Sequence, residues 1–101
     1  MKTVTICGSM RFAEEMREIA WVLETQQDMN VLQCVYDPTG VILSPEAVEA
    51  LTAAHYRKID LSDAIYVVDI GGYIGQSVRQ EIAYAQAQGK QVLFHSSFGK
   101  G

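Results

Sequence analysis

Glu81 is the residue of this sequence whose surroundings most strongly suggest chemistry. A glycine-rich stretch, Gly71–Gly75, precedes it, and the apolar residues around it recur at helical spacing. These apolar residues are Val78, Ile82 and Ala85. At about 100° per residue, Glu81 lies on the flank of this stripe, where a carboxylate can act as a nucleophile or a base. The positive end of the helix would stabilise its charged form. The alternative is an ion pair at a packed surface with one of three arginines, Arg11, Arg57 or Arg79.

A second candidate is the loop Cys7-Gly8-Ser9-Met10-Arg11, which joins a predicted strand to a predicted helix. Free N–H groups at a helix start, the Ser9 hydroxyl and the Arg11 guanidinium together suit a phosphate or the polar edge of a sugar. An ordinary turn, with Ser9 capping and Arg11 in solvent, explains the same residues. Three residues separate Cys7 from Arg11, too few for a cysteine-based phosphatase loop, and the dinucleotide fingerprint and the Walker A pattern are absent.

A third candidate is the loop that follows the strand ending at Asp69. Gly72 and Gly75 permit close approach of the backbone to a ligand, although a tight turn alone also explains them. Ser77 is the predicted N-cap of the next helix, with Gln80 at the capping-box position. Asp69 has the position of a phospho-acceptor aspartate, but no acidic pair follows the first strand to hold magnesium.

His55 lies on the apolar stripe of a helix with strong start signals. Ser44 is its predicted N-cap, Pro45 its first residue, and Asp60 its end. The stripe consists of Val48, Leu51, His55 and Ile59. A histidine in such a place is more often a hydrogen-bonded core residue than a catalyst, and both interpretations stay open at this point.

The elements that must position these residues alternate along the chain. Strands are predicted at residues 3–7, 31–35, 64–68 and 91–94, and helices at residues 13–26, 45–60 and 78–88, with a stop at Gly89. This order predicts an α/β fold, a small doubly wound parallel sheet of about four strands with helices on both faces, flavodoxin- or Rossmann-like. Ligands bind at the carboxyl ends of such strands, so the loops 8–12, 36–43 and 69–76 should open on one edge.

The composition is that of a single domain over residues 1–101, with 49% hydrophobic residues. A net charge of −4 gives no electrostatic footprint for nucleic acid, and no apolar run approaches the ~18 residues of a membrane span. The N-terminal stretch lacks the apolar core of a signal peptide, so we expect a cytoplasmic protein with Cys7 and Cys34 reduced and buried in strands. Because small domains are marginally stable, a homodimer or higher homo-oligomer is expected. No cofactor and no metal ligand is predicted.

Three stretches give the sequence a resemblance to a known family. They are the strand that ends in Cys-Gly-Ser-Met-Arg, the triplet Ser62-Asp63-Ala64 before the third strand, and Ser77-x-x-x-Glu81-Ile82-x-x-Ala85 with Gly89-Lys90 before the last strand. In these features the chain resembles the nucleoside 2-deoxyribosyltransferase superfamily, which includes 2′-deoxynucleoside 5′-phosphate N-hydrolases. The resemblance covers nearly the whole chain and implies a nucleoside or nucleotide substrate, with Glu81 as the nucleophile that attacks the anomeric carbon.

By the same resemblance, Ser9, Arg11 and Ser77 contact the sugar or its 5′ substituent. The family protonates the leaving base with an aspartate near the end of the second helix, and His55 stands close to that place here. Histidine can donate a proton at neutral pH, so His55 is the expected acid. The chain is shorter than the transferases, which favours a hydrolase over a base-exchange enzyme. The alternative is a non-catalytic nucleotide-binding or sensor module on the same fold.

Overall fold

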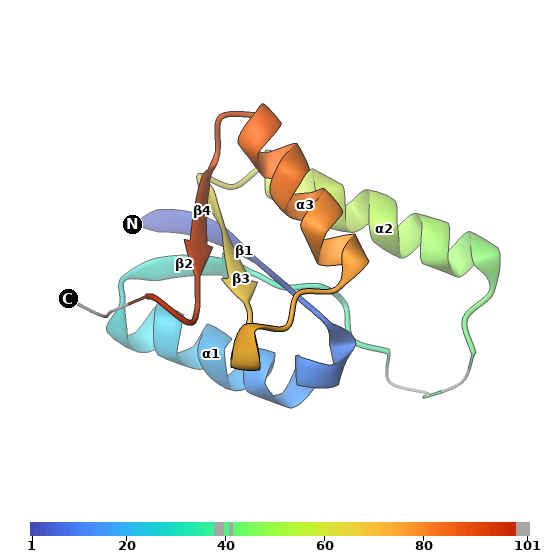
Figure 1. Cartoon of the computed structure of the whole chain (residues 1–101), viewed down its shortest axis with the longest axis horizontal. Coiled ribbons are helices and arrows are strands. Elements are labelled where there is room, and N and C mark those ends of the chain that lie inside the picture. Colours follow the sequence, from blue (N-terminus) through green and yellow to red (C-terminus); the bar gives the residue numbers. More distant parts are fainter. Residues whose placement is uncertain (38–39, 41, 99–101) are drawn as a thin grey trace.

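The computed structural model describes residues 1–37, 40 and 42–98, whose elements follow the predicted β-α-β-α-β-α-β order (Figure 1). The strands are β1 (Lys2–Gly8), β2 (Met29–Leu32), β3 (Ala64–Val68) and β4 (Gln91–Phe94). The helices are α1 (Ala13–Gln26), α2 (Pro45–Asp60) and α3 (Gln76–Ala87). Two short 3-10 helices, η1 (Met10–Phe12) and η2 (Ile70–Gly72), follow β1 and β3.

The four strands form one parallel sheet in the order β2-β1-β3-β4. Helix α1 covers one face, and α2 and α3 lie together on the other (Figure 1). The prediction of a small doubly wound, Rossmann-like α/β fold is therefore confirmed. The chain runs from β1 outward to β2 and then returns across β1 to β3. The point where the strand order reverses, which is where such sheets bind ligands, consequently lies between the carboxyl ends of β1 and β3.

The alternation of side chains along β1 divides the core into two clusters. Val4 and Ile6 belong to the cluster on the α1 side, whereas Cys7 belongs to the cluster under α2 and α3. All five residues of β3 are buried, as expected for a parallel strand covered on both faces. The same period of two therefore places the Cys7 thiol on the face that carries α2 and α3.

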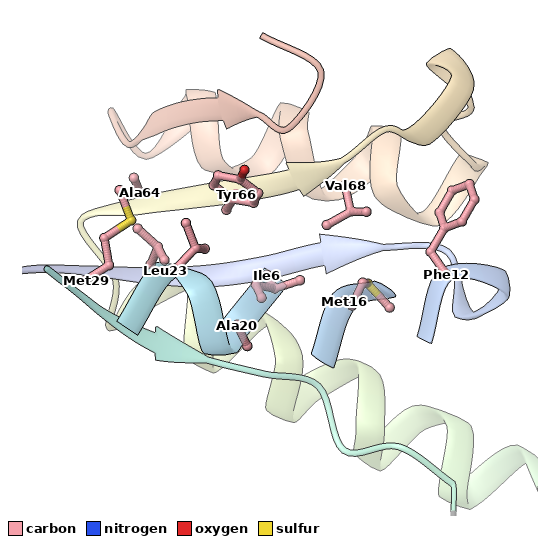
Figure 2. Close-up of a cluster of buried hydrophobic side chains, with 10 residues drawn as sticks. Ile6, Phe12, Met16, Ala20, Leu23, Met29, Ala64, Tyr66 and Val68 are labelled. Atoms are coloured by element: carbon pink, nitrogen blue, oxygen red, sulfur yellow. The ribbon is translucent and has the colours of Figure 1, made fainter. Parts of the chain in front are cut away.

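The cluster under α1 is built from residues at helical spacing. Figure 2 shows Met16, Ala20 and Leu23 of α1 together with Ile6 and Tyr66 of the sheet. Met16 and Leu23 are fully buried, and each such side chain contributes roughly 1.5–3 kcal/mol through the hydrophobic effect. The predicted start and end of α1 are confirmed.

Polar contacts fix the end of α2 against the sheet and β4. Thr5 Oγ1 lies 2.6 Å from Ser62 Oγ, which itself donates to the Lys58 carbonyl at 2.8 Å. Lys90 Nζ donates to the carbonyls of Asp60 and Ser62 at 2.9 and 2.8 Å. A cation at the carboxyl end of a helix satisfies free carbonyls and complements the helix dipole. These bonds hold the end of α2, and with it the helix that carries His55, in one position.

Two of the predicted helix signals, Ser44 at the start of α2 and Gly89 after α3, are confirmed. Ser44 Oγ accepts from the Ala47 N–H at 3.1 Å, and α2 begins at Pro45. Gly89 has a φ of 73° and follows α3, where the Lys90 N–H donates to the Ala85 carbonyl at 2.9 Å. This is the glycine-terminated end that the sequence predicts.

Several predicted boundaries are wrong. Strand β2 begins at Met29 and ends at Leu32, because the turn falls at Asp28, which has a φ of 54°, and not at Asn30. Cys34 therefore lies beyond the strand and is only partly buried. Val48 is 48% exposed, although the helical stripe predicted its burial.

The predicted start of the third helix is also wrong. Helix α3 begins at Gln76 with Gly75 as its N-cap, so Ser77 lies inside the first turn and does not cap it. Of the predicted irregular segment and tail, residues 38, 39, 41 and 99–101 lie outside the described residues. The described part of the tail turns back on the sheet, where Phe98 packs against Tyr66.

None of the helices within the described residues is both long enough and apolar enough to cross a membrane.

Gly8 is required by packing. A Cβ at this position would lie 2.7 Å from Met16 Sδ and 3.2 Å from Val68 Cβ, both of them buried residues. We expect Gly8→Ala to lower the free energy of unfolding by roughly 1–3 kcal/mol through overpacking. Urea denaturation with an unchanged slope measures this loss. Gly75→Ser is the matched control, since its nearest contact would be Tyr73 Oη at 3.6 Å, and it should remain as stable as the parent. Equal stability of Gly8→Ala and the parent would contradict the packing argument.

Candidate functional site

A cavity of about 640 Å³ opens at the carboxyl edge of the sheet, on the side of α2 and α3. Its walls come from the end of β1 and the start of η1, the segment after β2, one side of α2, and the start of α3. Each of the three loops predicted to open on this edge contributes: Ser9 from the first, Asp37 from the second and Tyr73 from the third. A volume of this size is ordinary for a small-molecule site.

Glu81 and His55 meet on the wall of this cavity. Glu81 Oε1 lies 3.3 Å from His55 Nε2, and the two side chains are 14% and 12% exposed. The contact joins α3 to α2, so both helices fix the position of the carboxylate. The alternative of an ion pair between Glu81 and an arginine has no support, because His55 is the basic partner of Glu81 within the described part of the chain.

Cys7 is the third member of this cluster. Its Sγ lies 3.4 Å from the same nitrogen, His55 Nε2, and the residue is fully buried. Burial raises the pKa of the Cys7 thiol well above its ordinary value, and the neighbouring Glu81 carboxylate raises it further. At neutral pH Cys7 is therefore a protonated thiol. Because a carboxylate oxygen only accepts, Nε2–H is the donor in the contact with Glu81. Nδ1 is buried with no hydrogen-bond partner among the described residues.

The first turn of α3 lines the cavity next to this cluster. Gly75, Gln76 and Ser77 all contribute, and no side chain caps the helix. The N–H groups at the start of a helix have no intrahelical acceptors and, with the helix dipole, attract an anion. Glu81 is one turn further along than this first turn. The helix dipole therefore stabilises its charge less than the sequence predicts, since the effect falls off within the first turn.

The predicted site residues of the loop after β1 differ in whether they line the cavity. Gly8 and Ser9 line it, but Ser9 Oγ also accepts from the Arg11 N–H at 3.3 Å as the cap of η1. Arg11 is not among the lining residues. Its guanidinium carbon lies 3.8 Å from the centre of the Tyr73 ring, and Tyr73 itself lines the cavity. The structure thus combines the two alternatives for this loop, a capped turn whose hydroxyl still faces a cavity.

Asp69 and Gly72 are not brought into the cavity. Asp69 is buried, and its two carboxylate oxygens accept from the N–H and the hydroxyl of Ser96 at 2.8 and 2.6 Å. These bonds tie the turn after β4 to the end of β3. Gly71 and Gly72 have φ values of 64° and 79°, and a Cβ on either would meet open space. The positive φ values of η2 therefore explain why these two residues are glycines, as the tight-turn alternative proposes.

Sequence reasoning missed the position of Cys7 beside His55 and Glu81. Residues 7, 55 and 81 are far apart in the chain, and no spacing motif connects them. The alternation along β1 could have placed Cys7 under α2 and α3, but not within contact of His55. Lys58 and Tyr56 on α2 also line the cavity and were not predicted.

No family model, no curated protein and no solved structure matches this chain. Fold and site define a small Rossmann-like α/β domain whose cavity at the carboxyl edge holds a carboxylate, an imidazole and a thiol in contact.

The two cysteines should differ in reactivity. Cys7 is fully buried, and its pKa is raised well above the ordinary value, whereas Cys34 is half-buried, and its pKa is raised mainly by burial and is partly lowered by Tyr36 and Lys58. Because each pKa unit changes the thiolate fraction about tenfold, we expect Cys34 to react with iodoacetamide at least about ten times faster than Cys7 at pH 8. Mass spectrometry of the Cys7→Ser and Cys34→Ser variants measures the two rates separately. Equal rates, or a faster Cys7, would show that Cys7 is not the buried thiol described here.

Proposed function

We propose that this protein cleaves the N-glycosidic bond of a nucleoside or a nucleoside 5′-monophosphate, with Glu81 as the nucleophile. The observation that carries the proposal is a carboxylate on the wall of a cavity, held by an imidazole and reachable from the open side. Support also comes from the resemblance of the sequence to the nucleoside 2-deoxyribosyltransferase superfamily, in which the matching glutamate has this role. The transition state of such a reaction resembles an oxocarbenium ion, which an adjacent carboxylate stabilises.

The chemistry needs two steps. In the first, an oxygen of Glu81 bonds to the anomeric carbon while the bond from that carbon to the base nitrogen breaks. The electron pair leaves with the base, which takes the Nε2 proton of a protonated His55, and His55 becomes neutral. In the second, water attacks the same carbon, the sugar leaves Glu81, and the proton of the water passes to His55. The net change is one water consumed and one base released. A second base in place of the water would make the reaction a transfer.

His55 has two functions in this scheme. In the absence of substrate its Nε2 is the hydrogen-bond partner of Glu81, which orients one carboxylate oxygen and leaves the other for the sugar. Proton donation to the base requires the same Nε2, because Nδ1 is buried away from the cavity solvent. The His55–Glu81 contact must therefore lengthen when the glycosidic bond is in place.

A 5′-phosphate would have a favourable place at the start of α3. The free N–H groups of this uncapped helix and the hydroxyls of Ser9 and Ser77 all line the cavity. Helix N-termini of this kind bind phosphate groups through the N–H groups and the dipole. The arrangement favours a nucleoside monophosphate over an uncharged nucleoside as the substrate.

The second candidate function is a nucleotide-binding or sensor module without turnover. Two observations motivate this function. His55 stands near the place where the nucleoside 2-deoxyribosyltransferase superfamily has its aspartate acid, and the side chains of His55 and Glu81 are in contact with each other. Binding of nucleotides without release of base would select this function.

Substrate screening tests the proposal. We expect release of free base from at least one compound of a panel of ribo- and deoxyribonucleosides and their 5′-monophosphates, measured by chromatography. Loss of the nucleophile in Glu81→Gln should lower kcat at least about 10³-fold with the fold intact. Glu49→Gln, at an exposed position of α2 outside the cavity, is the matched control and should keep full activity. Turnover that survives in Glu81→Gln would exclude the glutamate mechanism, and the absence of base release from the whole panel would exclude the cleavage reaction.

We also propose that the protein is a homodimer joined through the N-terminal half of α2. This half extends beyond the sheet in Figure 1, and it carries Val48, which is 48% exposed, near the exposed Leu43 that precedes the helix. Burial of this surface by a second copy would add apolar contacts that a domain of this size lacks alone.

Light scattering tests the dimer. We expect the mass of two chains at micromolar concentration, and a shift to one chain in Val48→Asp, because a buried unpaired carboxylate opposes association. Glu49→Gln should leave the dimer intact. A parent protein that is monomeric at this concentration, or a Val48→Asp variant that stays dimeric, would contradict the proposed interface.

A further inference from the structure

Three donor atoms of different chemical kinds converge at one point of the cavity wall. They are Cys7 Sγ, His55 Nε2 and a carboxylate oxygen of Glu81, and all three lie within 4.8 Å of one another. They come from β1, α2 and α3, so three separate elements of the fold hold them. The contacts are 3.4 Å from Sγ to Nε2 and 3.3 Å from Nε2 to Oε1.

Two of the three distances between these atoms are close to the edges of a tetrahedral zinc site, and the third, from Sγ to the carboxylate oxygen, is at most 4.8 Å. With Zn–S of about 2.3 Å and Zn–N and Zn–O of about 2.0–2.2 Å, a tetrahedral angle separates S from N by about 3.6 Å and N from O by about 3.4 Å. The observed distances agree with both edges to within about 0.2 Å.

We propose that Cys7, His55 and Glu81 bind Zn²⁺ as three protein ligands, with the fourth position open to the cavity. Sulfur and imidazole ligands favour zinc over magnesium or calcium, which prefer oxygen alone. Three protein ligands and one open position form the arrangement of zinc sites that bind a water or a small molecule. The charges also balance, since one thiolate and one carboxylate together neutralise one Zn²⁺.

A catalytic relay from cysteine through histidine to glutamate does not explain the cluster. A relay uses both ring nitrogens, one facing the nucleophile and the other facing the carboxylate. Here Sγ and Oε1 both approach Nε2, while Nδ1 is buried without a hydrogen-bond partner among the residues described. Convergence on one nitrogen suits a cation between the three atoms and does not suit the transfer of a proton along them.

The surroundings also set the expected strength of the site. Zinc binds the thiolate form of cysteine, so binding must release the proton of Cys7, and affinity should fall as the pH is lowered. A metal-bound histidine usually donates its other N–H to a carboxylate or carbonyl, which strengthens binding about 10–100-fold. His55 Nδ1 has no such partner in the part of the chain that the structure describes, so the site should bind zinc more weakly than a structural zinc site does.

Occupancy has a consequence for the reaction. If Glu81 is the nucleophile, as the proposed function states, a bound Zn²⁺ takes its carboxylate and blocks cleavage. This consequence alone rests on the proposed function. The metal site itself is tested without substrate, so failure of one proposal can be distinguished from failure of the other.

The test uses chelator-treated protein, titrated with Zn²⁺ in a calorimeter and with Co²⁺ in a spectrophotometer. We expect one metal ion per chain, release of a proton on binding, and a thiolate-to-cobalt charge-transfer band in the near ultraviolet. Cys7→Ser should lose the band, and His55→Gln and Glu81→Gln should each weaken Zn²⁺ binding at least about tenfold. Cys34→Ser is the matched control, because Cys34 also lines the cavity but lies outside the cluster, and it should keep the band.

Circular dichroism of each variant shows whether the fold survives. His55→Gln and Glu81→Gln change side chains that are less buried than Cys7 and keep the test decisive if Cys7→Ser does not fold. No Zn²⁺ binding by the parent protein would overturn the proposal. Binding that is unchanged in both His55→Gln and Glu81→Gln, or a cobalt band that is lost in Cys34→Ser and kept in Cys7→Ser, would overturn it as well.

Discussion

The central strands β1 and β3 are buried on both faces, and the rest of the structure follows from this constraint. Side chains of β1 alternate between α1 on one face and α2 with α3 on the other, and every residue of β3 is buried. A parallel sheet of four strands needs helices on both faces to achieve this. On the side of α2 and α3, a cavity opens at the carboxyl edge of the sheet. The candidate site therefore lies beside the apolar cluster under α2 and α3, the cluster in which Cys7 is buried.

This origin explains why the site is chemically unusual. Polar groups next to a hydrophobic layer must satisfy one another, and Glu81, His55 and Cys7 do so around a single nitrogen. The carboxylate has a hydrogen-bond donor, and the thiol stays protonated because its pKa is raised. Of the polar atoms in this cluster, Nδ1 of His55 has no hydrogen-bond partner among the residues described. A buried nitrogen without a hydrogen-bond partner costs free energy. This cluster is therefore not explained by a contribution to the stability of the fold.

The sequence predicts the fold more completely than the site, for physical reasons that individual residues illustrate. Ser44-Pro45 and Gly89 are local signals, and the helix ends they predict are confirmed because short-range hydrogen bonds decide them. The predicted start of β2 is wrong because Asp28 adopts a positive φ that no local rule requires. The predicted N-cap Ser77 is wrong because the glycine-containing turn ends at Gly75, and α3 begins directly after it. In the same way, Asp69 was expected at the ligand, but the turn after β4 binds both of its oxygens.

The position of Cys7 shows the limit of sequence reasoning most clearly. Periodicity places Glu81 near a buried face and Cys7 on the face below it, but a contact within 3.4 Å of His55 depends on how far α2 and α3 lie from the sheet. That spacing depends on Lys90, Ser62 and the packing of both helices, which no single stretch of sequence encodes. The same contact makes the two proposed chemistries exclude one another. A sugar needs the free carboxylate of Glu81, and a zinc ion needs that carboxylate together with the thiolate of Cys7. Because binding of the metal must remove the proton of the Cys7 thiol, lower pH favours the metal-free carboxylate of Glu81 and higher pH favours the metal.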